Sequence, residues 1–136
     1  MDIFTALKTA CTNQTSIMSI VATNASLPTS ARIWQEWPRT YTVPALIMEC
    51  DSEDMQNDLS GHSDLTLADL TITCRADSHA ASHALWVALQ TLAGQSSPFH
   101  LTIEDVTHAP TAKEDGSSAH WYDHVISCQA SWVEVI

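Results

Sequence analysis

The sequence predicts a single α+β domain over residues 1–136, with one antiparallel β-sheet and two main helices packed on one face of it. Two patterns predict this class: segments of alternating hydrophobicity, typical of half-buried strands, and one Ala/Leu-rich segment with helical spacing. The chain is long enough to bury a core, and 45% hydrophobic residues exclude wholesale disorder. The expected order of elements is α-β-β-β-α-β-β.

The first third of the chain is expected to hold a helix, a loop and a short strand. Asp2 can cap a helix that runs to about Cys11, with apolar residues on one face. The apolar patch at 17–21 either extends this helix or forms a separate turn. Residues 22–31 have the composition of a loop, and residues 32–34 can begin a short strand.

Two stronger strands follow in the middle of the chain. Pro44 precedes an apolar segment, 45–50, and proline is tolerated at the start of a strand. Residues 65–76 alternate between apolar and polar side chains, which indicates a half-buried antiparallel strand. The polar residues from 51 to 62 are predicted to connect these two strands as the end of a hairpin.

The last third contains the best helix and two further strands. Ser78 or the preceding aspartate can begin the helix, and Gly94 can end it. Residues 99–103 and 121–135 are predicted as strands. The loop from 109 to 119 between them is expected to be the most mobile segment.

The composition is strongly acidic. The net charge is −11, from 16 Asp and Glu against 5 Lys and Arg. So few cations cannot neutralise many phosphates, so tight wrapping of nucleic acid is not expected, although DNA can slide past a surface of like charge. The acidic cluster is either a solvated edge or a functional surface such as a channel lining. Its members are Glu49, Asp51, Glu53, Asp54, Asp58 and Asp64.

No motif predicts catalysis, a metal or a cofactor. His79 and His83 are four residues apart on the best helix, but the apolar stripe places them on its solvent side, without the glutamate of a metalloprotease motif. Asp123 and His124 are neighbours in a strand and therefore point to opposite faces. Three glycines cannot form a phosphate-binding loop. We therefore expect no enzyme activity, and we expect zinc to leave the melting temperature unchanged.

The sequence also lacks targeting signals. No apolar stretch is long enough for a membrane helix, and the N-terminus does not resemble a secretory signal. A cytoplasmic site of synthesis is the resulting expectation. The four cysteines have no C-x-x-C spacing, which favours reduced, buried thiols, with a disulfide between two strand cysteines as the alternative.

Two of the five tryptophans lie where a monomer need not bury them. Trp34 and Trp37 are flanked by polar residues, and exposed aromatic residues of this kind are frequent at protein interfaces. We therefore predict an interface that includes Trp34, Trp37 and Arg39, together with Lys113 and Asp115 of the 109–119 loop. Ordinary core positions for the tryptophans are the alternative.

Five segments together carry a resemblance to a known family. They are R-I-W at 32–34, V-P-A-L-I-M-E at 43–49, L-A-D-L-T-I-T-C-R-A at 67–76, D-S-H-A-A-S-H-A-L at 77–85 and C-Q-A-S-W-V at 128–133. Over residues 2–133 the pattern resembles the tail-completion, or tail-terminator, family of long-tailed bacteriophages. After Met55 the chain departs from the family pattern, because L-S-G-H at 59–62 replaces an aspartate-glycine turn.

The resemblance implies a structural virion protein that forms a hexameric ring on top of the tail tube. Such a ring stops tube polymerisation, joins the tail to the connector of the head, and leaves an axial channel for DNA. The implied partners are copies of this chain, the tail tube protein and the connector or stopper protein, without specific DNA binding or a membrane. The acidic cluster would then line the channel. Alternatives are a head-completion (stopper) protein of the neck, a small intracellular ligand-binding module and, in another class, a small hydrolase.

Overall fold

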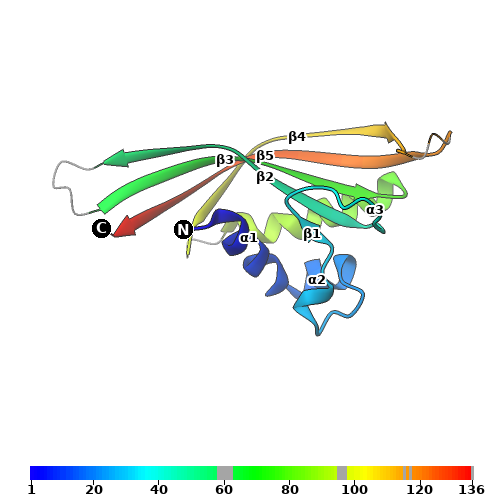
Figure 1. Ribbon diagram of the computed structural model, residues 1–136, viewed down its shortest axis with the longest axis horizontal. Helices are drawn as coiled ribbons and strands as arrows, with labels where there is room; N and C mark the ends of the chain where they lie inside the picture. The colour runs from blue at the N-terminus through cyan, green and yellow to red at the C-terminus, as the bar shows by residue number, and fades with distance from the viewer. Residues whose placement is uncertain (58–62, 95–97, 115, 117, 136) are drawn as a thin grey trace.

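The computed structural model describes residues 1–57, 63–94, 98–114, 116 and 118–135, and it confirms the α+β class. In this part of the chain, three α-helices and one five-stranded sheet account for the regular structure, with two short 3₁₀ helices (Figure 1). The helices are α1 (Ile3–Thr12), α2 (Thr15–Val21), η1 (Pro28–Ser30), α3 (His79–Leu89) and η2 (Gln90–Gly94). The strands are β1 (Ile33–Trp34), β2 (Ala45–Asn57), β3 (Ser63–Ala76), β4 (His100–Ala112) and β5 (His120–Val135).

The sheet is mixed, with the strand order β1-β2-β3-β5-β4. Strands β2, β3, β5 and β4 pair antiparallel, whereas β1 runs parallel to β2 through Ile33 opposite Leu46 and Trp34 opposite Ile47. The prediction of a wholly antiparallel sheet is therefore wrong for β1. Residues 35–44 return the chain to the starting end of β1, as a parallel pair requires, and a two-residue strand has no periodicity that could indicate its direction.

Local capping explains where the helices begin. Asp2 caps α1, since its carboxylate accepts hydrogen bonds from the Phe4 amide (3.1 Å) and the Thr5 hydroxyl (2.8 Å). For α3 the cap is Ser78, whose hydroxyl accepts from the Ala81 amide at 3.2 Å. The apolar patch at 17–21 belongs to a separate helix, α2, and does not extend α1.

All three helices lie on one face of the sheet, which we call the inner face (Figure 1). The core fills the space between the helices and the sheet. Leu7, Ile17 and Leu85 from the helices belong to the same buried cluster as alternate residues of β3 such as Leu70 and Ile72. Fully burying one such side chain contributes about 1.5–3 kcal/mol. Among the described residues, no helix combines the length and apolar character needed to cross a bilayer.

Two strands are longer than the sequence predicted. β2 continues through the acidic residues to Asn57, and β4 continues to Ala112, so 51–57 and 109–112 are not connections. Both extensions lie on strands at the edges of the sheet, and their residues are exposed on both faces. Because neither face is buried, the sequence there shows no alternation of apolar and polar residues. Pro110 is compatible with β4 because a strand at the edge of a sheet tolerates proline.

One end of the sheet projects beyond the helices (Figure 1). It consists of residues 52–57 of β2, 63–67 of β3 and 131–135 of β5, and we call it the arm. The N-terminus lies below the sheet near the base of the arm, whereas the end of β5 lies at the tip of the arm. The outer face of the arm is open, whereas its inner face is covered near the base, where Thr66 and Trp132 are buried.

Candidate functional site

The outer face of the sheet, opposite the helices, carries a row of carboxylates. On β3, Leu70 and Ile72 point to the core, so Asp69 and Thr71 point outward, as the alternation predicted. Direct partners across an antiparallel sheet share a face, so this register gives the outer face Asp123, which is paired with Arg75, and five further acidic residues. They are Glu49, Asp51, Asp54, Asp69 and Asp105.

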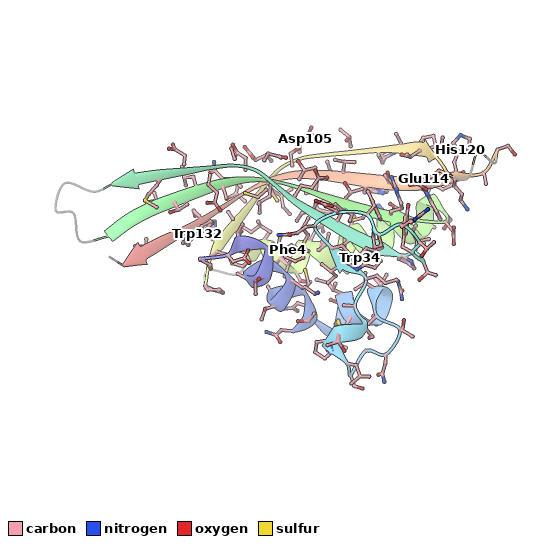
Figure 2. All side chains as sticks on the ribbon, viewed as in Figure 1. Phe4, Trp34, Asp105, Glu114, His120 and Trp132 are labelled. Atoms are coloured by element: carbon pink, nitrogen blue, oxygen red, sulfur yellow. The ribbon has the colours of Figure 1, made fainter. Side chains whose placement is uncertain are left out.

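Hydrogen bonds hold two of these carboxylates against the sheet. The Thr71 hydroxyl donates to Asp51 at 2.6 Å, and the Ser52 hydroxyl donates to Asp69 at 3.1 Å. Asp105 lies on the side of the sheet away from the helices (Figure 2). Sequence analysis did not select Asp69 and Asp105, because it sought a continuous acidic run and they belong to other strands.

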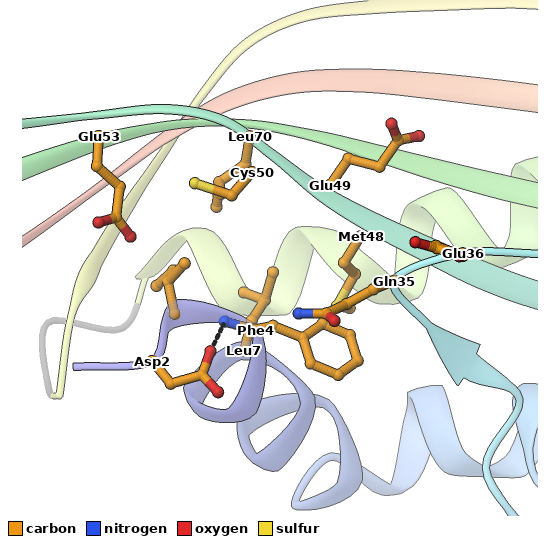
Figure 3. A pocket seen from close by; sticks show the side chains of 11 residues that line it. Asp2, Phe4, Leu7, Gln35, Glu36, Met48, Glu49, Cys50, Glu53 and Leu70 are labelled. Atoms are coloured by element: carbon orange, nitrogen blue, oxygen red, sulfur yellow. Dashed lines mark hydrogen bonds between the residues drawn. The ribbon is translucent and has the colours of Figure 1, made fainter.

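The remaining predicted acidic residues do not join this row. Glu53 pairs with Ala68 and lies on the inner side, and its carboxylate points toward α1 while that of Glu49 points away (Figure 3). Asp64 is in β3 at the tip of the arm. Asp58 lies outside the described residues. The structure therefore supports three members of the predicted set, Glu49, Asp51 and Asp54, on one surface.

All five Lys and Arg residues are among the described residues, and none neutralises this row. Lys8 is on α1, and Arg32 donates to the carbonyl oxygens of Pro44 (2.8 Å) and Ile20 (3.1 Å). The other three cations, Arg39, Arg75 and Lys113, lie at or near the end of the sheet opposite the arm. The open part of the outer face is therefore a surface of uncompensated negative charge.

A cavity of about 410 Å³ lies between α1 and the edge of β2 (Figure 3). Its apolar floor includes Phe4, Leu7 and Met48, and the carboxylates of Asp2 and Glu53 stand at its margin. It is an open groove at a sheet edge with a mixed polar and apolar lining.

At the end opposite the arm, an aromatic cluster covers Arg75. The guanidinium lies 4.1 Å from the centroid of the Trp37 ring and forms two 2.9 Å hydrogen bonds with the Asp123 carboxylate. It also donates to the Tyr41 hydroxyl at 3.0 Å. Burial alone would lower the pKa of Arg75, but the hydrogen bonds and charge of Asp123, with Tyr41, outweigh it and raise that pKa above its ordinary value.

The cluster fastens the loop 35–43 to the hairpin of β4 and β5. The Tyr41 hydroxyl donates to Glu114 at 2.8 Å, and the Trp121 indole donates to the same carboxylate at 3.0 Å. The hydrogen bond from Trp121 lowers the pKa of Glu114 most, and the hydrogen bond from Tyr41 lowers it further. These contacts connect two segments that are far apart in the sequence, since Tyr41 and Glu114 are separated by 73 positions.

Four of the five predicted interface residues gather at this end. Trp34 and Trp37 are half-buried against Tyr41, with ring centroids 6.2 Å and 4.8 Å away. The premise that a monomer leaves these tryptophans unburied is therefore wrong, and their place in an interface stays a prediction. Arg39 and Lys113 line one surface groove, and the Lys113 ammonium lies 4.1 Å from the Trp121 ring centroid. Asp115 lies outside the described residues.

The arm carries exposed apolar side chains on both faces. Leu65 and Val133 are direct partners on the outer face, and Met55 lies on the inner face; their exposed fractions are 38%, 58% and 54%. Thr66, beside Met55, has a buried hydroxyl without a hydrogen-bond partner among the described residues. Sequence analysis did not identify this surface, although apolar residues on both faces of one strand pair were a signal for it.

The sheet has two open edges. β1 covers only Leu46 and Ile47 of β2, so the described backbone from residue 48 to 57 pairs on one side only. At the other edge, β4 pairs only with β5. The two edge strands run in opposite directions, so the edge of one copy can meet the other edge of a second copy in antiparallel orientation.

No protein-family model matches the chain, and no curated protein matches its sequence.

Proposed function

We propose that this protein is a ring-forming structural subunit, a tail terminator of a long-tailed bacteriophage, located at the neck of the virion. The observation that carries the proposal is the pair of different open edges, one of which ends in the apolar arm. Two different surfaces on one subunit favour head-to-tail contacts, and such contacts close into a ring when the rotation between copies is right.

The arm supports assembly with further copies. A protein gains free energy by covering exposed apolar area, at roughly 25 cal/mol per Å². Leu65 and Val133 are neighbours across the sheet, so one partner surface can cover both. A stable contact between copies would bury on the order of 1,000 Å² or more in total. The arm and the adjoining edge of β2 together offer an extended surface of this kind.

The acidic outer face fits a channel for DNA. In a ring, each copy would contribute its five outward carboxylates, repeated around the axis. Phosphates passing such a wall would be repelled from it, so DNA would move through without specific binding. The end with Arg39 and Lys113 would then face away from the channel wall, where these cations are free to contact the tail tube or the connector.

Size measurement with matched variants tests the assembly. We expect light scattering to give a particle mass several times the chain mass of 14.9 kDa, for the purified protein alone or mixed with tail tubes. Val133→Lys should shift the assembly toward monomers, because it places a charge in the arm. Val87→Lys, at an exposed position on α3, makes the same change away from the arm and should leave assembly intact.

Two results would remove the proposal. The first is a protein that stays monomeric at every concentration and leaves tail tubes unbound. The second is equal assembly of both lysine variants, which would exclude the arm. A stopper protein of the neck is separated from a tail terminator by mixing with each partner: the terminator binds tail tubes, and the stopper binds the connector of the head.

A further inference from the structure

Four histidines from three elements gather at the start of α3. His79 and His83 lie one turn apart on the helix, and His108 of β4 and His124 of β5 are direct partners across the sheet beneath it. The ring centroids of His79, His108 and His124 are 5.0, 5.2 and 5.3 Å apart. His83 lies 5.6 Å from His124 and 6.3 Å from His79.

These spacings match those of imidazoles that share a metal ion. Bonds of about 2.0–2.1 Å from zinc to nitrogen place the ring centroids of two tetrahedral ligands about 5 Å apart. The triangle of His79, His108 and His124 has this size on all three sides. His83 is close enough to His124 to provide the fourth ligand of the ion. A water molecule can occupy this fourth position instead.

The hydrogen bonds of His124 prepare it to bind a metal. Its ring is buried, and Nδ1 lies 2.5 Å from the hydroxyl oxygen of Ser82. The same hydroxyl lies 3.1 Å from the Cys74 carbonyl oxygen, to which it can donate its one hydrogen. In the tautomer in which it does so, the hydroxyl accepts from Nδ1 and Nε2 has a free lone pair, the arrangement that a second hydrogen bond typically fixes in metal-binding histidines.

The exposure of the other rings suits an ion that enters from solvent. His79, His83 and His108 are exposed and can be reached from water. As they stand, no three His, Cys, Asp or Glu side chains of the described residues already surround one metal position. The exposed rings must therefore turn about their side-chain torsions to converge.

We propose that His79, His108 and His124, with His83 as the fourth group, form a binding site for a divalent transition metal that prefers imidazole, such as Zn²⁺. The ion would fasten the first turn of α3 to β4 and β5, in addition to the contact between Ser82 and His124. The proposal is independent of ring assembly, and it replaces the sequence-based expectation that zinc has no effect.

Zinc titration of the full chain, after treatment with a chelator, tests the site. We expect saturable binding of one Zn²⁺ per chain by calorimetry, a higher melting temperature with zinc, and Co²⁺ absorption bands typical of four-coordinate nitrogen ligation. The variant H79Q/H108Q should weaken binding by more than about tenfold, the loss that even removing a partner of a metal ligand produces.

The control is H100Q/H120Q, which replaces two exposed histidines on β4 and β5 outside the cluster. It should bind Zn²⁺ as the unmodified protein does. All replaced side chains in both variants are exposed, so circular dichroism should show an unchanged fold. Absence of saturable binding by the unmodified protein would overturn the proposal, and so would equal losses in the two variants, which would indicate scattered surface binding.

Discussion

The buried ion pair between Arg75 and Asp123 gives the sharpest test of the structure. Both residues are buried, with exposed fractions of 6% and 7%, and they share two hydrogen bonds of 2.9 Å. Arg75→Met keeps most of the side-chain volume but leaves the Asp123 carboxylate without its counter-charge. The Thr111 hydroxyl, at 3.0 Å, then remains as its described side-chain donor. One hydroxyl cannot replace the solvation of a full charge.

The expected loss is about 3–5 kcal/mol of unfolding free energy, the usual result of breaking a buried pair on one side. Replacing both partners, in R75M/D123L, should recover part of this loss, because no uncompensated charge is then buried. The cost of the single variant therefore comes mainly from the stranded carboxylate.

Urea unfolding followed by tryptophan fluorescence measures these differences, at one fixed protein concentration so that assembly contributes equally. Arg39→Met is the matched control, since Arg39 is exposed near the same end, and it should change stability by less than about 0.5 kcal/mol. A loss below about 1 kcal/mol for R75M would show that the pair is solvated. A double variant no more stable than R75M would contradict the argument from the stranded charge.

Two further predictions concern single side chains. Cys50 is exposed while the other three cysteines are buried, so a thiol reagent should modify one thiol per folded chain and four in denaturant. Partial burial, and then the negative charges of Glu53 and Asp51, raise the pKa of Cys50. Its reaction with the reagent should therefore be slow at neutral pH. The pKa of Glu114 is lower in the folded protein than its ordinary value of 4.5. The ionised Glu114 side chain therefore makes its full contribution to stability above about pH 4.5, and this contribution is lost as the pH falls through the lowered pKa. Tryptophan fluorescence should therefore change at acidic pH as the hydrogen bond from Trp121 breaks, and Glu114→Gln should abolish that transition.

The sequence predicts best those elements that bury one face. Residues 65–76 and the helix beginning after Ser78 alternate or repeat in step with their geometry, because one side of each contacts the core. The extensions 51–57 and 109–112 have no such contrast, since both sides are exposed and their strand conformation depends on pairing with β3 and β5. Local patterns do not contain that information.

A bulge explains why the acidic residues could not be assigned to faces by counting. Simple alternation from Glu49 would place Glu53 outward and Asp54 inward. The irregularity between Cys50 and Ser52 adds one residue, which reverses the faces of everything that follows. Glu53 therefore points to the inner side and Asp54 joins the outward row. Similarly, the histidine cluster joins residues up to 45 positions apart, from His79 to His124, which only the tertiary fold brings together.

The positions of the bulges also restrict how two copies can meet. On β2 the extra residue is Asp51, next to Cys50, and on β4 it is Glu104, next to Ile103. Cys50 and Ile103 lie in the same row across the sheet, so both edges are interrupted at nearly the same level, each by an added carboxylate. A bulge bends its strand, and a charge on an edge opposes pairing, so these points resist edge-to-edge contact.

Pairing in the register that aligns the two bulges would bring Asp51 of one copy near Glu104 of the next, at a cost in repulsion. The segments free of interruption are the arm part of β2, residues 52–57, and the two parts of β4 on either side of Glu104. A contact that uses the arm must therefore be offset along the strands. Because an offset contact displaces each copy relative to the last in a fixed direction, it either curves into a closed ring or continues as a helix, and the measured mass distinguishes the two.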